Sequence, residues 1–368
     1  MPDAHTHTNA KLPPKPYVIL ALEEKGFCAV LCKGKASRMQ SRNILDFMPM
    51  VKKASVAWID YVTDDFQNEA VVVAKQLGFT ETLVRNLLGG SHSSYEDFDS
   101  EMGVRIPAIL VKGFDVSLEP LLILIRKNML VTIHTSETKR FFRLRRYSET
   151  FMRKLPSAMK QNDKITLILL RIIDENNARN FDHLQEIEAH GDELSHHLSN
   201  PNSPRDLMGK KIYEMKHALI VYLGGLWATV DALNSLRYGD ADQLSDDPKL
   251  INRIAGLVSE VHAQIGLAEH LGEVLASGLE VLQSIYNNQL QILNNRVTLL
   301  AGYLAILGAA IMVPNTIGTI LGVAMFEFTP NDIPWYFGLL LLSTVVALMV
   351  SYWTVKKSGL LPSRPDAG

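Results

Sequence analysis

Residues 297–326 read VTLLAGYLAILGAAIMVPNTIGTILGVAMF, a run of 30 residues without a charged side chain. A second uncharged run of 21 residues, WYFGLLLLSTVVALMVSYWTV, follows at 335–355. A helix needs about 20 apolar residues to cross the hydrocarbon core of a bilayer. The sequence therefore predicts two membrane-spanning helices, at 297–326 and 335–355, joined by a short loop at 327–334.

The charged residues that flank the two spans predict their orientation. Arg296 precedes the first span, and Lys356 and Lys357 follow the second. The loop contains Glu327 and Asp332 but neither lysine nor arginine. Because basic residues stay on the cytoplasmic side, we expect both ends of the chain in the cytoplasm and the loop outside. The first residues show no apolar signal-peptide segment and no transit peptide, and the lack of a transit peptide leads us to expect a prokaryotic plasma (inner) membrane.

A long helical pattern runs into the first span. No proline occurs between Leu250 and Pro314, and apolar residues recur at helical spacing through 250–296. A helix of about 75 residues would be roughly 110 Å long. Because so long a helix needs partners along its length, we expect a bundle of identical stalk helices around a symmetry axis.

The rest of the chain divides into a strand-containing part and a helical part. Two short strands are expected within 16–34, one near Val18 and one after the turn at 23–26. Further strand patterns at 55–62, 106–112 and 129–133, with a helical stretch at 67–88 that Gly78 interrupts, predict an α+β or α/β domain. Long helices are then expected, including one over 163–199. The expected parts are a cytoplasmic α/β domain (1–147), a helical cytoplasmic region (148–249), the stalk (250–296), the first span (297–326), the loop (327–334), the second span (335–355) and a cytoplasmic tail (356–368).

Composition argues against several functional classes. A net charge of −2 and a pI near 6.6 argue against general binding of nucleic acid. Cys28 and Cys32 are expected to be reduced residues of a cytosolic core. We find no glycine-rich phosphate loop, nucleophile elbow or catalytic triad signature, so nothing indicates an enzyme, and no cofactor is expected.

Several short segments carry a resemblance to a known family. Residues 326–331 read FEFTPN, residues 58–60 read WID, residues 130–134 read LVTIH, and Pro314 lies inside the first span. Together with the order of the parts, these segments resemble the CorA-type magnesium transporters, a family of two-span metal ion transporters. The resemblance implies a homopentamer in which the first span of each subunit lines a pore. Mg²⁺, or another divalent cation such as Co²⁺, Ni²⁺ or Zn²⁺, would be the substrate, and the cytoplasmic domain would control gating, with Mg²⁺ as a regulator.

The sequence departs from the family at its Gly-Met-Asn signature, which forms the outer mouth of the pore. These positions, counted back from the FEFTPN segment, are occupied by Val323, Ala324 and Met325. Their side chains carry no oxygen, although their backbone carbonyls could still face a hydrated cation. Gly322 is present one place earlier, but no asparagine follows it.

Polar and small residues share one face of the first span. Asn315 and Thr319 lie four residues apart, on the same helical face as Gly308, Ile311 and Gly322. Such a face in a membrane helix indicates either a pore lining or tight packing between helices. With Val323, Ala324 and Met325, these residues are the candidate pore lining.

Charged residues at both ends of the spans are further candidates. In an oligomer, Glu327 and Asp332 would form acidic rings that attract cations to the pore mouth. The alternative is that both residues merely keep a short external loop hydrated. Lys356 and Lys357 would form a basic ring at the cytoplasmic face of the membrane.

A histidine-rich helical segment offers a possible metal site. His183, Glu186, His190 and His197 recur near one helical face, and imidazole ligands would favour Zn²⁺, Ni²⁺ or Co²⁺ over Mg²⁺. The competing interpretation is a hydrated polar face without any ligand. The basic cluster at 139–146 is expected to be a solvated linker face.

Two other functions remain open from the sequence. A relative that has lost transport would serve as a membrane-anchored sensor or scaffold. A Zn²⁺ transporter with an altered pore mouth would keep transport but change the ion.

Overall fold

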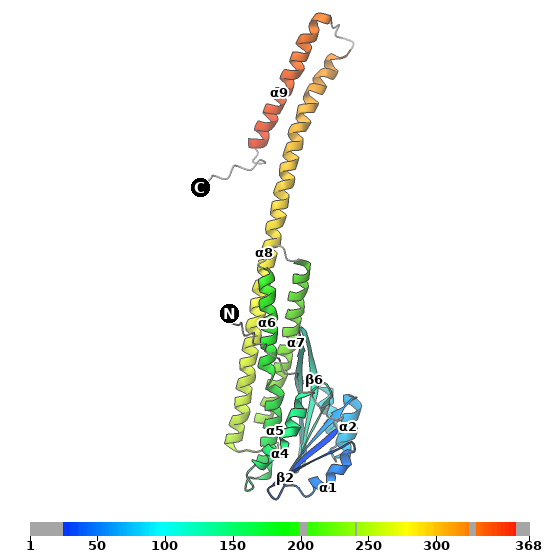
Figure 1. Ribbon diagram of the computed structural model, residues 1–368, viewed down its shortest axis with the longest axis vertical. Helices are drawn as coiled ribbons and strands as arrows, with labels where there is room; N and C mark the ends of the chain where they lie inside the picture. Colours follow the sequence, from blue (N-terminus) through cyan, green and yellow to red (C-terminus); the bar gives the residue numbers. More distant parts are fainter. Residues whose placement is uncertain (1–24, 91, 199–204, 240, 324–328, 358–368) are drawn as a thin grey trace, which may run out of the picture. The chain divides into compact units, whose positions relative to one another are not determined.

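The structure is a computed structural model in which the chain divides into two compact units, residues 1–277 and 278–368 (Figure 1). The strand predicted near Val18 lies outside the described residues. The description covers residues 25–90, 92–198, 205–239, 241–323 and 329–357, without the side chains of 195–198 and 205–207.

The first unit is built on a seven-stranded sheet with the order β2-β1-β3-β7-β6-β5-β4. β3 and β7 pair in parallel, whereas all the other neighbouring pairs are antiparallel. The hairpin from β1 to β2 turns at Lys33 and Gly34, and both have a positive φ, which glycine adopts without steric cost. The strands are β1 (Gly26–Cys32), β2 (Lys35–Ser41), β3 (Val56–Thr63), β4 (Ser94–Phe98), β5 (Glu101–Lys112), β6 (Asp115–Arg126) and β7 (Met129–Thr135).

Helices cover both faces of the sheet and make three layers (Figure 1). On one face lie η1 (Ile44–Phe47), α1 (Met48–Val51), α2 (Phe66–Gln76) and α3 (Glu81–Gly89), which pack on alternate strand residues such as Ile59 and Val131. The predicted helix over 67–88 is confirmed with its interruption at Gly78, where φ is +92°. The layered α/β domain predicted from the sequence is therefore confirmed.

The other face of the sheet is covered by helices from the long helical part of the chain. α4 packs on β1 and β2, α5 on β3 and β7, and α7 on β5 and β6. Gly225 of α7 permits this approach, because a Cβ there would lie 2.6 Å from Leu118 Cδ2. The helices are α4 (Arg140–Arg153), α5 (Gln161–Asn177), α6 (Asn180–Leu198), α7 (Arg205–Tyr238) and α8 (Pro248–Leu321).

The helix predicted over 163–199 is two helices, α5 and α6, separated after Asn177. The break has a physical cause in the side chains around it. Arg140 donates from its guanidinium to the backbone carbonyl of Asn176, and the side chain of Asn176 donates to the carbonyl of Pro107 at 2.9 Å. Asparagine is a poor helix former, and a carbonyl at the end of a helix needs such an external donor.

The second unit contains the two helices that were predicted to span the membrane. α8 continues through Pro314 to Leu321, and after the short helix η2 (Pro330–Asp332) comes α9 (Ile333–Lys357). Among the described residues, three helices are long and apolar enough to cross a membrane. In one of them, Met208–Tyr238, 56% of the apolar window is buried, against 6% in each of the other two. The apolar side of α7 is therefore used as protein core, which favours the two predicted spans.

Candidate functional site

One side of α8 packs against α9 in the second unit. Gly302 is buried there, and a Cβ added to it would lie 3.4 Å from Val355 Cγ1 of α9. At Gly318 an added Cβ would lie 3.3 Å from the hydroxyl of Tyr336. Between these glycines, the half-buried residues of α8 are Ile306, Gly308, Ala309, Ala310, Pro314 and Ile317, and four of them, at 306, 310, 314 and 317, follow one another at a spacing of three or four positions.

The predicted pore-lining residues lie on the other side of α8. Ile311 is 67% exposed, Asn315, Thr319 and Gly322 are exposed, and Gly308 is half-buried. At about 100° per residue, this face is roughly opposite the one that α9 covers. The structure thus places the five residues on one face, and a single chain leaves four of them exposed.

The polar groups on this face are only partly engaged. The hydroxyl of Thr319 donates to the backbone carbonyl of Asn315 at 2.8 Å, so its oxygen lone pairs stay available. The side-chain amide of Asn315 makes no hydrogen bond with any described residue. An amide at membrane depth needs a partner or water, so this face requires either another subunit or a hydrated path.

The loop between the two helices is described only in part. Asp332 is half-buried, and one of its oxygens accepts from the backbone N–H and the hydroxyl of Thr329, at 2.9 and 2.7 Å. Its carboxylate therefore caps η2 while its second oxygen stays open. Val323 is half exposed, whereas Ala324, Met325 and Glu327 lie outside the described residues.

Basic residues end α9 at the opposite end from the loop. Lys356 and Lys357 occupy its last turn, and the ammonium of Lys357 lies 4.9 Å from the ring centroid of Trp353. An aromatic ring beside a lysine is typical of the membrane–water interface. This arrangement agrees with the placement of the basic pair at a membrane surface.

A buried ion pair, which the sequence did not predict, joins α4 to the sheet. Asp60 of β3 is fully buried, and its carboxylate accepts from Arg145 Nε at 2.6 Å and lies 3.2 Å from His134 Nε2. Thr132 donates to the same carboxylate and accepts from the indole N–H of Trp58 at 3.1 Å. Burial raises the pKa of Asp60, but Arg145, His134 and Thr132 together hold this pKa below its ordinary value.

The expectation that the basic cluster at 139–146 is a solvated face is therefore wrong for two of its members. Arg145 is 2% exposed and Arg140 is 9% exposed. Arg140 reaches into the unit and donates to the backbone carbonyls of Ile109 and Asn176. The two arginines fasten α4 to the sheet and to the end of α5.

A second buried polar cluster connects the helices of the first unit. Asn180 of α6 donates from its amide to Gln264 Oε1 of α8 at 3.1 Å, and the hydroxyl of Tyr222 of α7 donates to the carbonyl of Asn180 at 2.7 Å. His183 is buried close to Arg140. These contacts join α6, α7 and α8.

The histidine-rich segment of α6 faces the turn between β5 and β6. Glu186 Oε1 accepts from the backbone N–H of Gly113 at 3.3 Å, and the ring of His190 lies 5.2 Å from that of Phe114. Within the described part of the chain, no group of three or more His, Cys, Asp or Glu side chains could hold a metal ion. Because the side chain of His197 is not described, a metal site with His183 stays a prediction.

Lowering the pH from 7.5 to 5 is expected to destabilise the first unit through His183. Burial, and then Arg140 and Arg179, lower the pKa of His183 from 6.5 to about 4. Because the folded-state pKa is the lower one, the unfolded state binds the proton first, and stability falls as the pH drops from about 6.5 towards 4. The expected loss at pH 5 is about 2 kcal/mol.

Thermal melting of the detergent-solubilised full chain at both pH values measures this effect. The wild type should lose more stability than His183→Gln. His190→Gln, which changes an exposed histidine of the same helix, should keep the wild-type pH dependence. Equal losses in the wild type and His183→Gln would contradict the prediction.

The fold and the two long apolar helices define a membrane protein with a large α/β and helical unit. The family model described as "CorA-like Mg2+ transporter protein" matches residues 53–357. The chain therefore belongs to the CorA-like Mg²⁺ transporter family, a family of divalent-cation transporters.

Solved structures share this fold at low sequence identity. The complete CorA magnesium transporter from Methanocaldococcus jannaschii is 18% identical with a TM-score of 0.66, and the match covers 91% of this chain and 98% of that one. The full-length CmaX protein is 12% identical with a TM-score of 0.58 over 91% and 98%. The ZntB cytoplasmic domain from Vibrio parahaemolyticus is 12% identical with a TM-score of 0.52 over 71% and 98%. A search of curated proteins finds no match.

Proposed function

We propose that the protein is a homopentameric channel or transporter for a divalent cation, Mg²⁺ in the first place. The observation that carries this proposal is the uncovered face of α8, with Asn315 and Thr319 opposite the side that α9 covers. Five such faces around an axis would line a path with neutral oxygens and with rings of Ile311. Mg²⁺ gives up its water reluctantly, so it would pass this path in hydrated form.

Exposed apolar residues along α8 support the oligomer. Leu279, Val281, Tyr286, Leu290 and Leu293 are between 37% and 57% exposed in the single chain. These residues precede the first span, so lipid would not cover them. Packing α8 against copies of itself would remove this apolar surface from water.

The membrane orientation and the pore mouth follow from the same arrangement. Both ends of the chain would lie in the cytoplasm, with Lys356 and Lys357 at the inner membrane surface. Glu327 and the open oxygen of Asp332 would attract cations to an outer mouth that lacks the Gly-Met-Asn signature. The cytoplasmic unit would gate the pore, with Mg²⁺ as regulator, and no catalytic step is involved.

Flux into liposomes tests this proposal. Purified wild-type protein should carry Mg²⁺, read by an internal dye, and parallel vesicles would report Co²⁺, Ni²⁺ and Zn²⁺. Asn315→Leu should lose most of the flux, because leucine side chains from the five subunits then replace the amides that face the hydrated ion. Gly338→Leu, which introduces the same side chain on α9 where an added Cβ meets nothing within 4 Å, should retain it.

The outcomes separate the possible functions. Flux of Zn²⁺ without Mg²⁺ would point to a zinc transporter with an altered mouth. Absence of flux for every divalent cation, in a correctly assembled oligomer, would overturn transport and leave a sensor or scaffold. The triple change Val323→Gly, Ala324→Met and Met325→Asn would then show whether the missing signature is the cause.

A further inference from the structure

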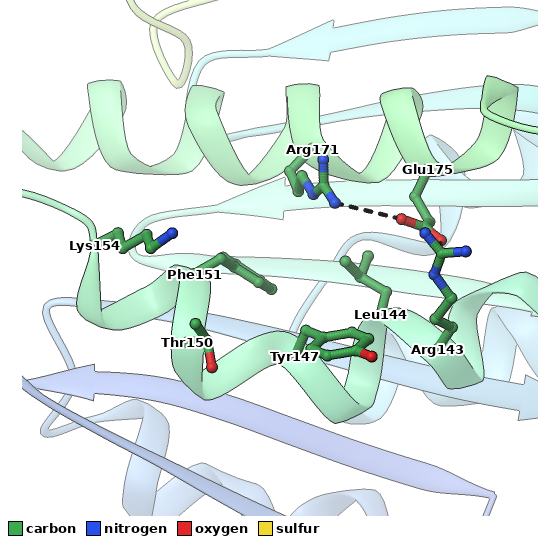
Figure 2. Close-up of a pocket in the computed structure, with 8 residues that line it drawn as sticks. All are labelled: Arg143, Leu144, Tyr147, Thr150, Phe151, Lys154, Arg171 and Glu175. Atoms are coloured by element: carbon green, nitrogen blue, oxygen red, sulfur yellow. Dashed lines mark ion pairs between the residues drawn. The ribbon is translucent and has the colours of Figure 1, made fainter.

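A cleft of about 560 Å³ lies between α4 and α5 in the first unit, apart from any residue of the proposed pore (Figure 2). Its volume is within the range of sites that bind small molecules. Figure 2 shows Lys154 at one end of the cleft and Arg143, Glu175 and Arg171 together at the other. The helical rise between Arg143 and Lys154 is about 16 Å, so the cleft is elongated.

The floor of the cleft is apolar and aromatic. Leu144, Tyr147 and Phe151 follow one another at helical spacing on the side of α4 that faces α5. The ring of Phe151 packs against the buried Trp58, with 6.1 Å between the two ring centroids. Tyr147 is 61% exposed, so its ring offers an open surface for stacking. A planar apolar group would fit against this pair of rings.

The charged residues that line the cleft are mostly positive. Arg143, Lys154 and Arg171 face a single acid, Glu175, whose side chain is 7% exposed. The carboxylate of Glu175 forms ion pairs with Arg143 at 3.4 Å and with Arg171 at 3.6 Å, and so holds both guanidinium groups at one end. Asp174 also pairs with Arg171, which leaves the whole cluster with an excess of one positive charge.

Two of the three cations have unused capacity to bind an anion. The side chain of Arg143 is 70% exposed, and its ion pair with Glu175 is through Nε, so much of its guanidinium stays open to solvent. Lys154 is exposed and forms no ion pair with any described residue. Guanidinium groups bind phosphate or carboxylate oxygens in pairs, which suits an anion with several oxygens.

We propose that this cleft binds an anionic small molecule with an aromatic ring, of the nucleoside phosphate class. The ring would stack on Tyr147 and Phe151, and the phosphates would lie against the exposed guanidinium of Arg143. Lys154 would add attraction from the other end. The inference concerns a ligand of the cytoplasmic unit and does not depend on the transport proposal.

Isothermal titration of the full chain in detergent, without divalent cations, tests the proposal with ATP, AMP, adenosine and pyrophosphate. ATP should bind, and adenosine and pyrophosphate should each bind more weakly, because each supplies only half of the contacts. Pyrophosphate that binds as tightly as ATP would show a simple anion site and overturn the aromatic part. No heat and no thermal stabilisation by ATP at millimolar concentration would overturn the proposal altogether.

Matched variants locate the binding to the cleft. Arg143→Gln and Tyr147→Ala should each weaken ATP binding by roughly tenfold. Arg146→Gln removes an exposed arginine of the same helix that does not line the cleft, and it should bind ATP like the wild type. If Arg143→Gln and Arg146→Gln weaken ATP binding equally, the binding is general electrostatic attraction, and the assigned site is overturned. Melting curves of each variant establish that the fold is intact.

Discussion

Replacing Asp60 by alanine is expected to lower the free energy of unfolding by about 3–5 kcal/mol, because it removes the carboxylate that pairs with the buried guanidinium of Arg145. Arg145 is only 2% exposed, so water cannot replace the lost carboxylate. His134 loses its contact with the same group at 3.2 Å. A loss of this size is a large part of the stability of a typical domain.

Urea unfolding of the full chain in detergent measures this change, with a signal from Trp58, which lies in the same network. Asp60→Asn serves as a milder variant if the alanine variant does not fold. Asp60→Ala combined with Arg145→Leu should regain much of the lost stability, since no buried charge is then left unpaired. Glu81→Gln breaks an exposed pair with Arg85 and should leave the midpoint almost unchanged.

The direction of the pKa shift of Asp60 also sets the pH range in which the buried ion pair stabilises the fold. The folded-state pKa of Asp60 lies below that of the unfolded chain, so the stabilisation is complete above about pH 4 and is lost only in stronger acid. The loss that His183 causes occurs at higher pH, between about 6.5 and 4. A midpoint of Asp60→Ala equal to that of the wild type would show that the pair contributes nothing to stability.

The sequence predicted the elements with strong local signals. Uncharged runs and helical spacing gave α8 and α9, and Gly78, with its positive φ, marked the break between α2 and α3. β2 was missed because it is an exposed edge strand of polar residues, KASRMQS, whose pairing depends on β1. Long-range pairing of this kind leaves little trace in a single sequence.

The buried arginines escaped prediction for a related reason. A cluster of basic residues is usually solvated, and the partner of Arg145 lies 85 positions away in the chain. A signal was nevertheless present in the strand VAWIDYVT, where Asp60 interrupts an apolar run. A carboxylate inside a buried strand requires a partner, so this strand by itself indicates a basic residue elsewhere in the chain.

Only part of the candidate pore could be derived from a single chain. Helical spacing placed Ile311, Asn315 and Thr319 on one face, and the structure added that α9 covers the other side. Whether that face lines a pore depends on copies of the chain around it. This information belongs to the assembly, and a test must therefore be carried out on the assembled protein in a membrane.

Cysteine substitutions along α8 are expected to separate the two faces by their effect on flux. With a cationic thiol reagent, Ile311→Cys, Asn315→Cys and Thr319→Cys should lose most of their flux, because the modified side chain places a fixed positive charge in the cation path. The background carries Cys32→Ser. Cys28 can remain, since it is fully buried and burial raises the pKa of its thiol to about 12.

The matched controls lie on the covered side of the same helix, at comparable depth. Ala310→Cys and Ile317→Cys face α9 and should keep their flux after the same treatment, because the reagent needs water to reach a thiolate. Inhibition at 310 and 317 but not at 311 and 315 would place the path on the wrong side of α8. Inhibition without any helical period would mean that α9 does not shield α8 in the membrane, and the orientation on which the pore proposal rests would have to be abandoned.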